Sequence, residues 1–307
     1  MKTLNLDQTP ALLDGGFGRE LSFRGIDILR PSWSANALLS DPDVVRQIHL
    51  DYIEAGADII MTNTYGIIRS ELAKEGMENH FEELNLIACQ LANEAREKTH
   101  QKVMIAGSLP PLFGSYRPDL VRDPTHIIPL YEEQAKLLAP QVDFFLCETM
   151  SSALEAQAAA TAACQFDKPV WIAWTLHEKR FGCLRSGETI STALEALADL
   201  PVSGILVNCC TPESITKAMP DLVKTEYKFI GGYANAFLPI PSDWKLDGDK
   251  DTDGSLDLRT DLDPDTYGEY ATEWLEAGAT IVGGCCGTRP AHIAKIRQIM
   301  DDHKSIQ

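Results

Sequence analysis

Three cysteines of this 307-residue sequence stand where thiols can do chemistry. Cys285 and Cys286 are adjacent and lie between glycines in the segment TIVGGCCGTRP, and Cys209 directly follows the apolar segment GILVN. Three thiolates around one point suit Zn²⁺, whose bonds to sulfur are about 2.3 Å long, and an open fourth position admits a substrate. The flanking glycines let the backbone turn tightly enough for adjacent cysteines to bind one ion. We therefore predict a zinc site formed by Cys209, Cys285 and Cys286.

The five other cysteines have a simpler interpretation. A free cysteine packs like a small apolar side chain, and we expect that role for most of them. Cys210 is a weaker competitor for the metal, because neighbouring residues of a strand point to opposite sides and Cys209 and Cys210 cannot easily face the same point. The cysteines assigned to packing are Cys89, Cys147, Cys164 and Cys183.

Eight short apolar segments must position these residues. Most are rich in Val, Ile, Leu or Phe without strict alternation, which is typical of parallel strands covered on both faces. Eight strand–helix units in about 300 residues predict an α/β fold of the (β/α)8 TIM-barrel type, in a single domain. The alternative, a doubly wound open sheet, is disfavoured because no G-x-G-x-x-G follows the first segment. The predicted strands begin at Ala11, Asp58, Val103, Asp143, Pro169, Gly204, Lys228 and Thr280.

Amphipathic stretches separate the apolar segments and predict helices, for example over residues 42–57 and 80–100. Several of these stretches end in Ala-Gly-Ala just before the next strand, as at residues 55–57 and 277–279. A glycine in that position fits the cap at a helix C-terminus.

Polar residues gather at the carboxyl ends of the predicted strands. In a (β/α)8 barrel these ends surround the active site, so residues far apart in the sequence are expected to meet at one mouth. The polar groups concerned are Asp14-Gly15-Gly16, Thr62-Asn63-Thr64, Glu148-Thr149, Asn208, Asn235 and the three cysteines of the predicted zinc site.

The bulk composition limits the class of protein. The chain is 44% hydrophobic and 23% charged, which is typical of a globular protein with a sizeable core. Its net charge of −18 argues against a nucleic-acid partner and against anionic membranes, because no basic stripe is available for phosphates. The sequence shows neither a signal peptide nor the run of about 18 apolar residues that a membrane helix needs. We expect a cytoplasmic protein whose cysteines are reduced.

Residues 241–265 form an aspartate-rich stretch, which we interpret as an acidic loop inserted into a barrel domain spanning residues 1–307. Asp249–Asp257 has the D-x-D-x-D-G spacing of a calcium loop. However, Thr260 stands where a bidentate glutamate is expected, and no helix pattern precedes the segment. A solvated acidic loop is the favoured interpretation, and calcium binding is the alternative.

The cysteine segments N-C and G-G-C-C-G, the opening D-G-G and the C-E-T of residues 147–149 together resemble the homocysteine S-methyltransferase family. The similarity extends from Leu12 to about Ile299. It implies a zinc-dependent barrel enzyme that methylates homocysteine to methionine, with zinc on the three cysteines of the predicted site. A homocysteine thiol, with a pKa of about 8.5 expected from cysteine, is a poor nucleophile at neutral pH, and coordination by zinc removes its proton.

The resemblance also implies a pocket for the amino-acid end of homocysteine. Glu148 is expected to pair with the ammonium group, although it could instead be a carboxylate that stabilises a helix start. Asp14 either shares the ammonium group or forms the following turn. The backbone N–H groups of Gly15, Gly16 and Phe17 are expected to hold the carboxylate, because glycine-rich turns bind anions.

Asn235 has two open interpretations: its amide oxygen caps the zinc when substrate is absent, or it satisfies a turn. Weaker candidates for contact with the substrate are Thr64, Tyr65 and Trp33.

The resemblance leaves several methyl donors open: S-methylmethionine, S-adenosylmethionine, betaine, or a methylfolate acting through a cobalamin module. The betaine-using branch tends to carry an aromatic pair where this sequence has Tyr65-Gly66, and we expect no folate or cobalamin module within 307 residues. We therefore predict a sulfonium donor, S-methylmethionine or S-adenosylmethionine. The alternatives are betaine, another thiol or selenol as acceptor, and a non-enzymatic zinc–thiolate redox sensor.

Overall fold

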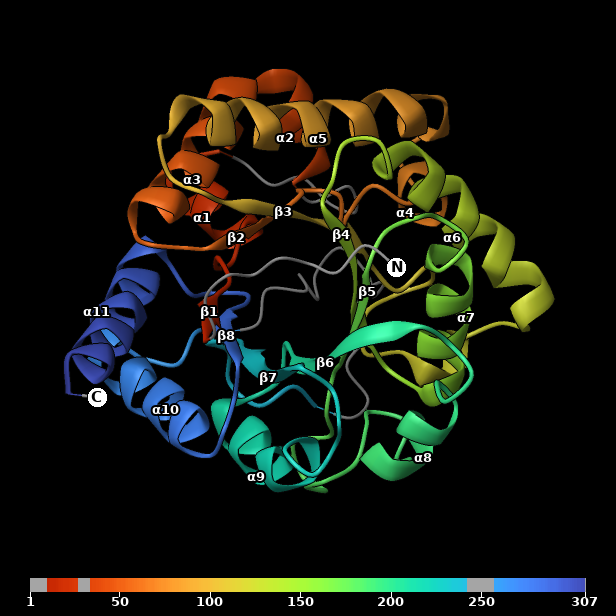
Figure 1. Cartoon of the computed structure of the whole chain (residues 1–307). Coiled ribbons are helices and arrows are strands. Elements are labelled where there is room, and N and C mark those ends of the chain that lie inside the picture. The colour runs from red at the N-terminus through yellow and green to blue at the C-terminus, as the bar shows by residue number, and fades with distance from the viewer. Residues whose placement is uncertain (1–9, 27–33, 242–256, 307) are drawn as a thin grey trace.

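The structure, a computed structural model, describes residues 10–26, 34–241 and 257–306. Eight parallel strands lie at the centre of this part of the chain, and helices surround them (Figure 1). Every one of the predicted apolar segments contains a strand. The strands are β1 (Ala11–Leu12), β2 (Ile59–Met61), β3 (Met104–Leu109), β4 (Phe144–Met150), β5 (Val170–Trp174), β6 (Val202–Asn208), β7 (Phe229–Ala234) and β8 (Ile281–Gly284).

The strands are arranged in chain order around a closed barrel. Each strand from β2 to β7 pairs in parallel with its successor, and β8 pairs with β1. A parallel bridge between Leu13 and Ile59 joins the first strand to the second. The predicted (β/α)8 barrel is therefore confirmed, and closure excludes the open doubly wound sheet.

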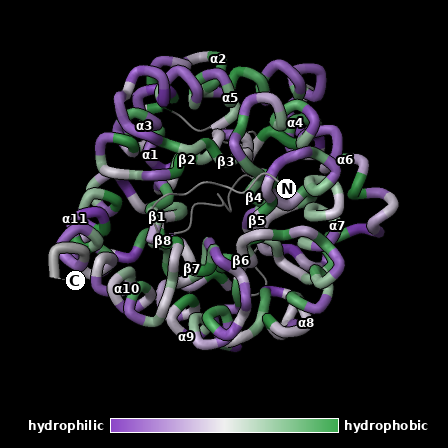
Figure 2. Tube along the Cα trace, viewed as in Figure 1, coloured by the Kyte–Doolittle hydropathy of each residue, from purple (hydrophilic) through white to green (hydrophobic). Residues whose placement is uncertain are grey.

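Helices form the outer ring, and hydrophobic and hydrophilic stretches alternate along them (Figure 2). Proline is the first residue of five α-helices and of one 3₁₀ helix, where its missing N–H costs nothing. The predicted C-terminal glycines are confirmed, since Gly56 and Gly278 have φ angles of 100° and 107°. The helices are α1 (Gly18–Phe23), α2 (Ala35–Ser40), α3 (Pro42–Glu54), α4 (Arg69–Ala73), η1 (Glu78–His80), α5 (Phe81–Lys98), η2 (Pro118–Leu120), α6 (Pro124–Leu138), α7 (Ala153–Ala163), α8 (Ile190–Glu195), α9 (Pro212–Leu222), α10 (Pro264–Glu276) and α11 (Pro290–Ile306).

Side chains that point inward fill the barrel. The ring of Trp171 lies 4.4 Å from that of Phe144 and 4.8 Å from that of Phe229, measured between centroids. Gly204 provides the space for this stack, because a Cβ there would lie 2.7 Å from the Trp171 ring. The barrel interior is therefore a packed core, and its mouth is the place left for chemistry.

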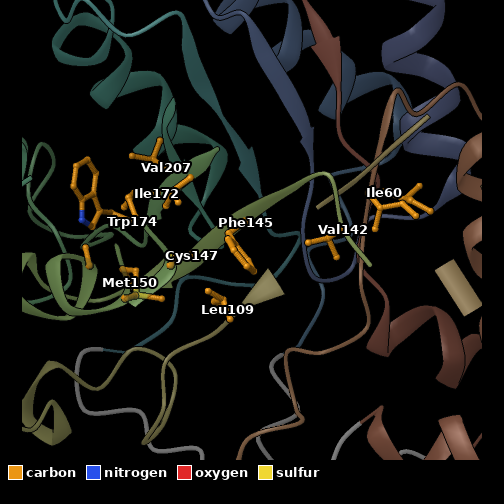
Figure 3. Close-up of a cluster of buried hydrophobic side chains, with 14 of the residues drawn as sticks. Ile60, Leu109, Val142, Phe145, Cys147, Met150, Ile172, Trp174 and Val207 are labelled. Carbon is orange, nitrogen blue, oxygen red and sulfur yellow. The ribbon is translucent and has the colours of Figure 1, made fainter. Parts of the chain in front are cut away.

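A second core lies between the barrel and the helices. Figure 3 shows part of it, with Phe145, Cys147 and Ile172 among neighbouring apolar side chains. Cys147 is fully buried in this layer, as expected for a packing residue. Cys89 is also buried in it, and Cys164 packs against it.

Several predicted features lie outside the described residues: Trp33, most of the acidic loop, and the calcium-like segment up to residue 256. The part of the loop that follows is tied to the barrel, because Leu258 forms an antiparallel bridge with Phe237. No helix in the described ranges is long and apolar enough to cross a membrane.

Candidate metal centre and active site

The sulfur atoms of Cys209, Cys285 and Cys286 form one cluster, at the carboxyl ends of β6 and β8. The three Sγ atoms lie within 4.8 Å of one another, and those of Cys209 and Cys286 are 3.7 Å apart. Tetrahedral zinc with bonds of about 2.3 Å separates its sulfur ligands by about 3.8 Å. Across the described ranges, no other group of three Cys, His, Asp or Glu side chains is close enough to bind a metal. The triad therefore has the donor atoms and the spacing of a thiolate metal site.

The backbone at Cys209 directs its side chain into the barrel. Along β6, Ile205 and Val207 face the helices and Leu206 faces the interior, so regular alternation would turn residue 209 outward. Cys209 instead has a φ of 49°, in the left-handed region, and its side chain joins the interior cluster. Cys210 is buried in the outer core, which removes it from the metal cluster.

Cys285 and Cys286 sit on a short loop between β8 and α11 that several hydrogen bonds hold in place. The N–H of Cys285 donates to the carbonyl of Ala234 at 2.9 Å, and the carbonyl of Cys286 accepts from the N–H of Ala236 at 2.8 Å. The hydroxyl of Thr288 donates to the carbonyl of Cys285 at 2.7 Å. The end of β7 and the start of α11 therefore fix both thiols against the mouth of the barrel.

Cys209 and Cys285 are buried and Cys286 is partly buried, and the three thiols influence one another electrostatically. Hydrogen bonds with Cys209 and Cys285 lower the pKa of Cys286 well below its usual range. Hydrogen bonds with Cys209 and Cys286, together with burial, raise the pKa of Cys285 well above its usual range. The three thiols thus perturb one another strongly, and a cation bound among them would offset the cost of holding thiolate charge in this space.

Glu148 occupies the carboxyl end of β4 and points into the barrel, as Phe144 and Leu146 do on the same face of the strand. The next residue, Thr149, has a φ of 60°, and the pairing of β4 with β5 shifts register beside it. The Asn208 side chain holds this bulge, since its Oδ1 accepts from the Thr149 N–H at 2.8 Å. The end of β6 therefore helps to position the end of β4.

The Glu148 carboxylate is buried and accepts hydrogen bonds from two hydroxyl groups. The hydroxyl of Ser108 donates to Oε1, and the hydroxyl of Tyr233 donates to Oε2 at 3.2 Å. Burial raises the pKa of Glu148 to about 7, against the opposing effect of these hydrogen bonds. A ligand cation that reaches this carboxylate would offset the cost of burying its charge.

Asp14 is buried at the end of β1, with one oxygen engaged and one not. Its Oδ2 accepts from the N–H of Met61 at 2.9 Å, whereas Oδ1 has no hydrogen-bond partner within the described residues. Burial raises the pKa of Asp14 well above its usual value, and the charge of Glu148 raises it further. The two carboxyl groups thus share one region of negative potential.

Gly15 and Gly16 lie against the loop that carries Cys285 and Cys286. A Cβ at Gly16 would lie 2.6 Å from the carbonyl oxygen of Cys285, and one at Gly15 would lie 2.8 Å from the hydroxyl of Thr288. The N–H of Gly16 donates to that hydroxyl at 3.3 Å. Both glycines are therefore required for close approach of the first and last barrel loops. Phe17, the next residue, packs its ring 4.8 Å from that of His49.

Thr64 and Tyr65 both lie near the pocket, in different environments. The Thr64 hydroxyl is buried and donates to the carbonyl of Ser108 at 2.7 Å, so it supports the serine that contacts Glu148. The Tyr65 hydroxyl lies 2.6 Å from that of Ser115. Burial raises the pKa of Tyr65, and the charge of Cys209 raises it further.

Asn235 follows β7, between the two cysteine-bearing strands. Its Oδ1 accepts from the N–H of Phe237 at 3.2 Å, which is the turn-forming role named above as an alternative. Its Nδ2 is buried without a partner among the described residues. In this conformation the amide oxygen is thus engaged by the turn.

Two tyrosines and one serine at the site were not predicted from the sequence. Tyr233 lies two positions before Asn235 on the inward face of β7, so strand alternation would have found it. Ser108 follows the same logic on β3. Tyr116 lies in the loop after β3, where no periodicity marks it, and its hydroxyl donates to the Cys209 sulfur at 3.0 Å.

Comparisons with known proteins agree with this arrangement. A family model described as homocysteine S-methyltransferase matches residues 11–300. The chain is 30% identical to a selenocysteine methyltransferase from Astragalus bisulcatus, over 96% of this chain and 94% of that protein. It is 28% identical to homocysteine S-methyltransferase 1 from Zea mays, over 94% of each.

A solved structure of similar fold contains a metal. It is the metallated form of the homocysteine methyltransferase MmuM from Escherichia coli, with a TM-score of 0.79 and 28% identity, over 95% of this chain and 96% of that chain. The family model and these relatives confirm the resemblance that the sequence indicated. The chain belongs to the homocysteine S-methyltransferase family of enzymes.

Proposed function

We propose that this protein transfers a methyl group from a sulfonium donor to homocysteine and gives methionine, with Zn²⁺ bound by Cys209, Cys285 and Cys286. The observation that carries the proposal is the cluster of three sulfur atoms within 4.8 Å, beside two buried carboxyl groups. Two names among the relatives, homocysteine S-methyltransferase and metallated homocysteine methyltransferase, support the acceptor and the metal.

The three cysteines would hold the metal, and three protein ligands would leave one position for a substrate. When bound there, zinc would supply a Lewis-acid site that favours the deprotonated, nucleophilic form of a substrate thiol. The glycines beside Cys285 and Cys286 let this loop pack closely against its neighbours, since a Cβ at Gly284 would lie 2.1 Å from the Thr288 hydroxyl.

The carboxyl groups of Glu148 and Asp14 would bind the ammonium end of the substrate. Both are buried, and Asp14 Oδ1 has no partner within the described residues, so an ammonium N–H can donate to it. The backbone turn of Gly15, Gly16 and Phe17 would hold the substrate carboxylate. With the ammonium fixed at β1 and β4, the substrate sulfur reaches toward the ends of β6 and β8.

The reaction is then a direct displacement between two positioned sulfur atoms. The substrate thiolate forms a bond to the methyl carbon as the bond from that carbon to the sulfonium breaks, and a neutral thioether leaves. The residues around the mouth contribute by holding both reactants in line, which reduces the entropic part of the barrier.

Several features favour a sulfonium donor. Two aromatic side chains lie near the site: the Tyr233 hydroxyl donates to Glu148, and the charge of Cys209 acts on Tyr65. Aromatic faces attract cations. Gly66 provides no second aromatic ring beside Tyr65. The overall charge of −18 raises the local concentration of a cationic donor.

The test is product formation with purified, zinc-loaded protein. Homocysteine is combined in parallel with S-methylmethionine, S-adenosylmethionine and betaine, and methionine is quantified. We expect the largest kcat/KM with S-methylmethionine. Betaine as the best donor would contradict the donor assignment, and the absence of methionine with all three donors would contradict the proposed reaction.

The acceptor needs a separate comparison, because one relative is named a selenocysteine methyltransferase. The same assay with selenocysteine in place of homocysteine measures the ratio of the two kcat/KM values. A higher kcat/KM with selenocysteine would identify selenocysteine as the preferred acceptor. The role proposed for the three cysteines would not change.

A further inference from the structure

Tyr116 places a phenol hydroxyl directly against one sulfur of the cysteine cluster. The hydroxyl donates to Cys209 Sγ at 3.0 Å, and the residue is buried, with 7% of its surface exposed. A phenol has a pKa of about 10, so its hydroxyl is protonated at neutral pH and acts as a donor toward a thiolate.

The backbone at Tyr116 is held in an unfavourable conformation. Its φ of 64° lies in the left-handed region, which is uncommon for a bulky residue and costs conformational energy. Gly114, two residues earlier, also has a positive φ, of 122°, so the loop after β3 turns sharply before it reaches the tyrosine. Such strain persists only where surrounding contacts enforce it.

Contacts on several sides enforce this position. The Tyr116 ring belongs to the apolar cluster inside the barrel. The Arg185 guanidinium lies 5.5 Å from the ring centroid, and it is itself anchored by a hydrogen bond to the carbonyl of Ile240 at 3.1 Å. The hydroxyl of Ser115 is 2.6 Å from that of Tyr65 and ties the loop to the end of β2.

A methyltransferase that uses cysteine ligands has a selectivity problem. The protein sulfurs surround the point to which the methyl group is delivered, and each thiolate is itself a nucleophile. A hydrogen bond donated to a thiolate withdraws charge from the sulfur and lowers its reactivity. Cys209 is the sulfur that receives such a bond from Tyr116.

Building on the proposed function, we propose that Tyr116 is a positioning residue that withdraws charge from the Cys209 sulfur, so that this ligand does not compete with the substrate thiol for the methyl group. Tyr116 touches neither reactant in this role and acts through Cys209. Without the bond, the Cys209 thiolate attacks a methyl carbon, a sulfur–carbon bond forms, the bond to the leaving group breaks, and the leaving group departs with the electron pair.

The first test is spectroscopic and needs no methyl donor. Co²⁺ is bound in place of zinc in wild type, Tyr116→Phe and Tyr131→Phe, and the thiolate-to-cobalt charge-transfer band is recorded. The control Tyr131→Phe removes a buried phenol hydroxyl that contacts the Met150 sulfur in the outer core, and leaves the Tyr116 loop unchanged. Because loss of the hydrogen bond raises the energy of the sulfur electrons, we expect the band to move to longer wavelength in Tyr116→Phe only.

The second test measures reactivity with iodomethane, which gives S-methylcysteine and iodide. The site of methylation is mapped by mass spectrometry on the zinc-loaded proteins. We expect methylation of Cys209 to be roughly tenfold faster in Tyr116→Phe, the effect of losing one hydrogen bond to a charged group. A contact that serves packing alone would leave this rate unchanged.

Incorporation of 3-fluorotyrosine at position 116 preserves the shape of the side chain and provides a second variant. Its phenol is a stronger donor, so the cobalt band is expected to move to shorter wavelength. A cobalt band that stays in place in Tyr116→Phe, or that moves equally in Tyr131→Phe, would overturn the proposal. If all variants bind cobalt and their bands do not move, the three cysteines still form the metal site. That result would refute only the role proposed for Tyr116.

Discussion

At the scale of single residues, Cys209 and Cys210 show how one backbone angle separates a metal ligand from a packing residue. Alternation along β6 predicts that the two side chains point in opposite directions, but continued regularly it places Cys209 outside. The left-handed φ of 49° reverses this assignment. The sequence could thus separate the two thiols, but the one that faces the axis does so through a backbone angle that strand alternation does not predict.

The Glu148 carboxylate provides a prediction at the same scale. If it pairs with the substrate ammonium, Glu148→Gln should raise KM for homocysteine roughly 10- to 100-fold, because a buried hydrogen bond to a charged group contributes about 1.5–3 kcal/mol. Zinc content should not change. The control is Glu155→Gln, since Glu155 is also buried with a pKa raised by burial to about 7 but bonds to Ser151 at the start of α7. An unchanged KM in Glu148→Gln would show that the ammonium group binds elsewhere.

The pH dependence of product binding extends this prediction. Burial raises the pKa of Glu148 to about 7, and the ammonium group pairs only with the ionised form. Methionine, which has no titrating thiol, should therefore bind more tightly as the pH rises through about 7, up to the pH at which its own ammonium group loses its proton. Calorimetric titration of wild type and Glu148→Gln checks this, and the dependence should disappear in the variant.

At the scale of elements, the strands were predictable and the loops were not. The eight apolar segments reveal β1 to β8 because parallel strands covered on both faces need continuous apolar sequence. The ends of the strands then place Asp14, Glu148 and the cysteines at one mouth. Tyr116 could not be predicted, because its position depends on the backbone path of the loop after β3. A loop has no periodic pattern in the sequence.

The contact between the first and last barrel loops gives a prediction for Gly16. A Cβ at this position would lie 2.6 Å from the carbonyl oxygen of Cys285 and 3.0 Å from the N–H nitrogen of Gly287, so the loop that bears two ligands must shift. We expect Gly16→Ala to weaken zinc binding roughly tenfold or more, as loss of outer support does in metal sites. A chelator competition assay measures this affinity.

Gly25→Ala is the matched control for this substitution. Gly25 has a φ of 82° with no atoms near a built Cβ, so alanine there strains the backbone without touching the metal loop. Its Tm should fall while its zinc affinity stays at the wild-type value. Equal loss of zinc affinity in both variants would mean that Gly16 acts through general stability.

At the scale of the whole molecule, barrel closure assembles the site. The pairing of β8 with β1 brings the last strand of the barrel beside the first. The bridge between Leu13 and Ile59 joins the first strand to the second. Asp14, near the start of the sequence, thereby lies beside the loop of Cys285 and Cys286, to which the N–H of Gly284 links it at 3.0 Å. Closure was predictable from eight repeated units, but the contact between these loops required the three-dimensional structure.

We propose above that Cys209, Cys285 and Cys286 bind one zinc ion. The most direct test is metal analysis of two variants in which neighbouring cysteines are replaced. Fully reduced wild type, Cys209→Ala and Cys210→Ala are loaded with zinc, freed of excess metal and analysed for zinc per chain. We expect one zinc ion per chain in wild type and in Cys210→Ala, because the Cys210 side chain packs in the outer core. We expect Cys209→Ala to lose tightly bound zinc. Full retention of zinc by Cys209→Ala, or its loss from folded Cys210→Ala, would contradict the assignment.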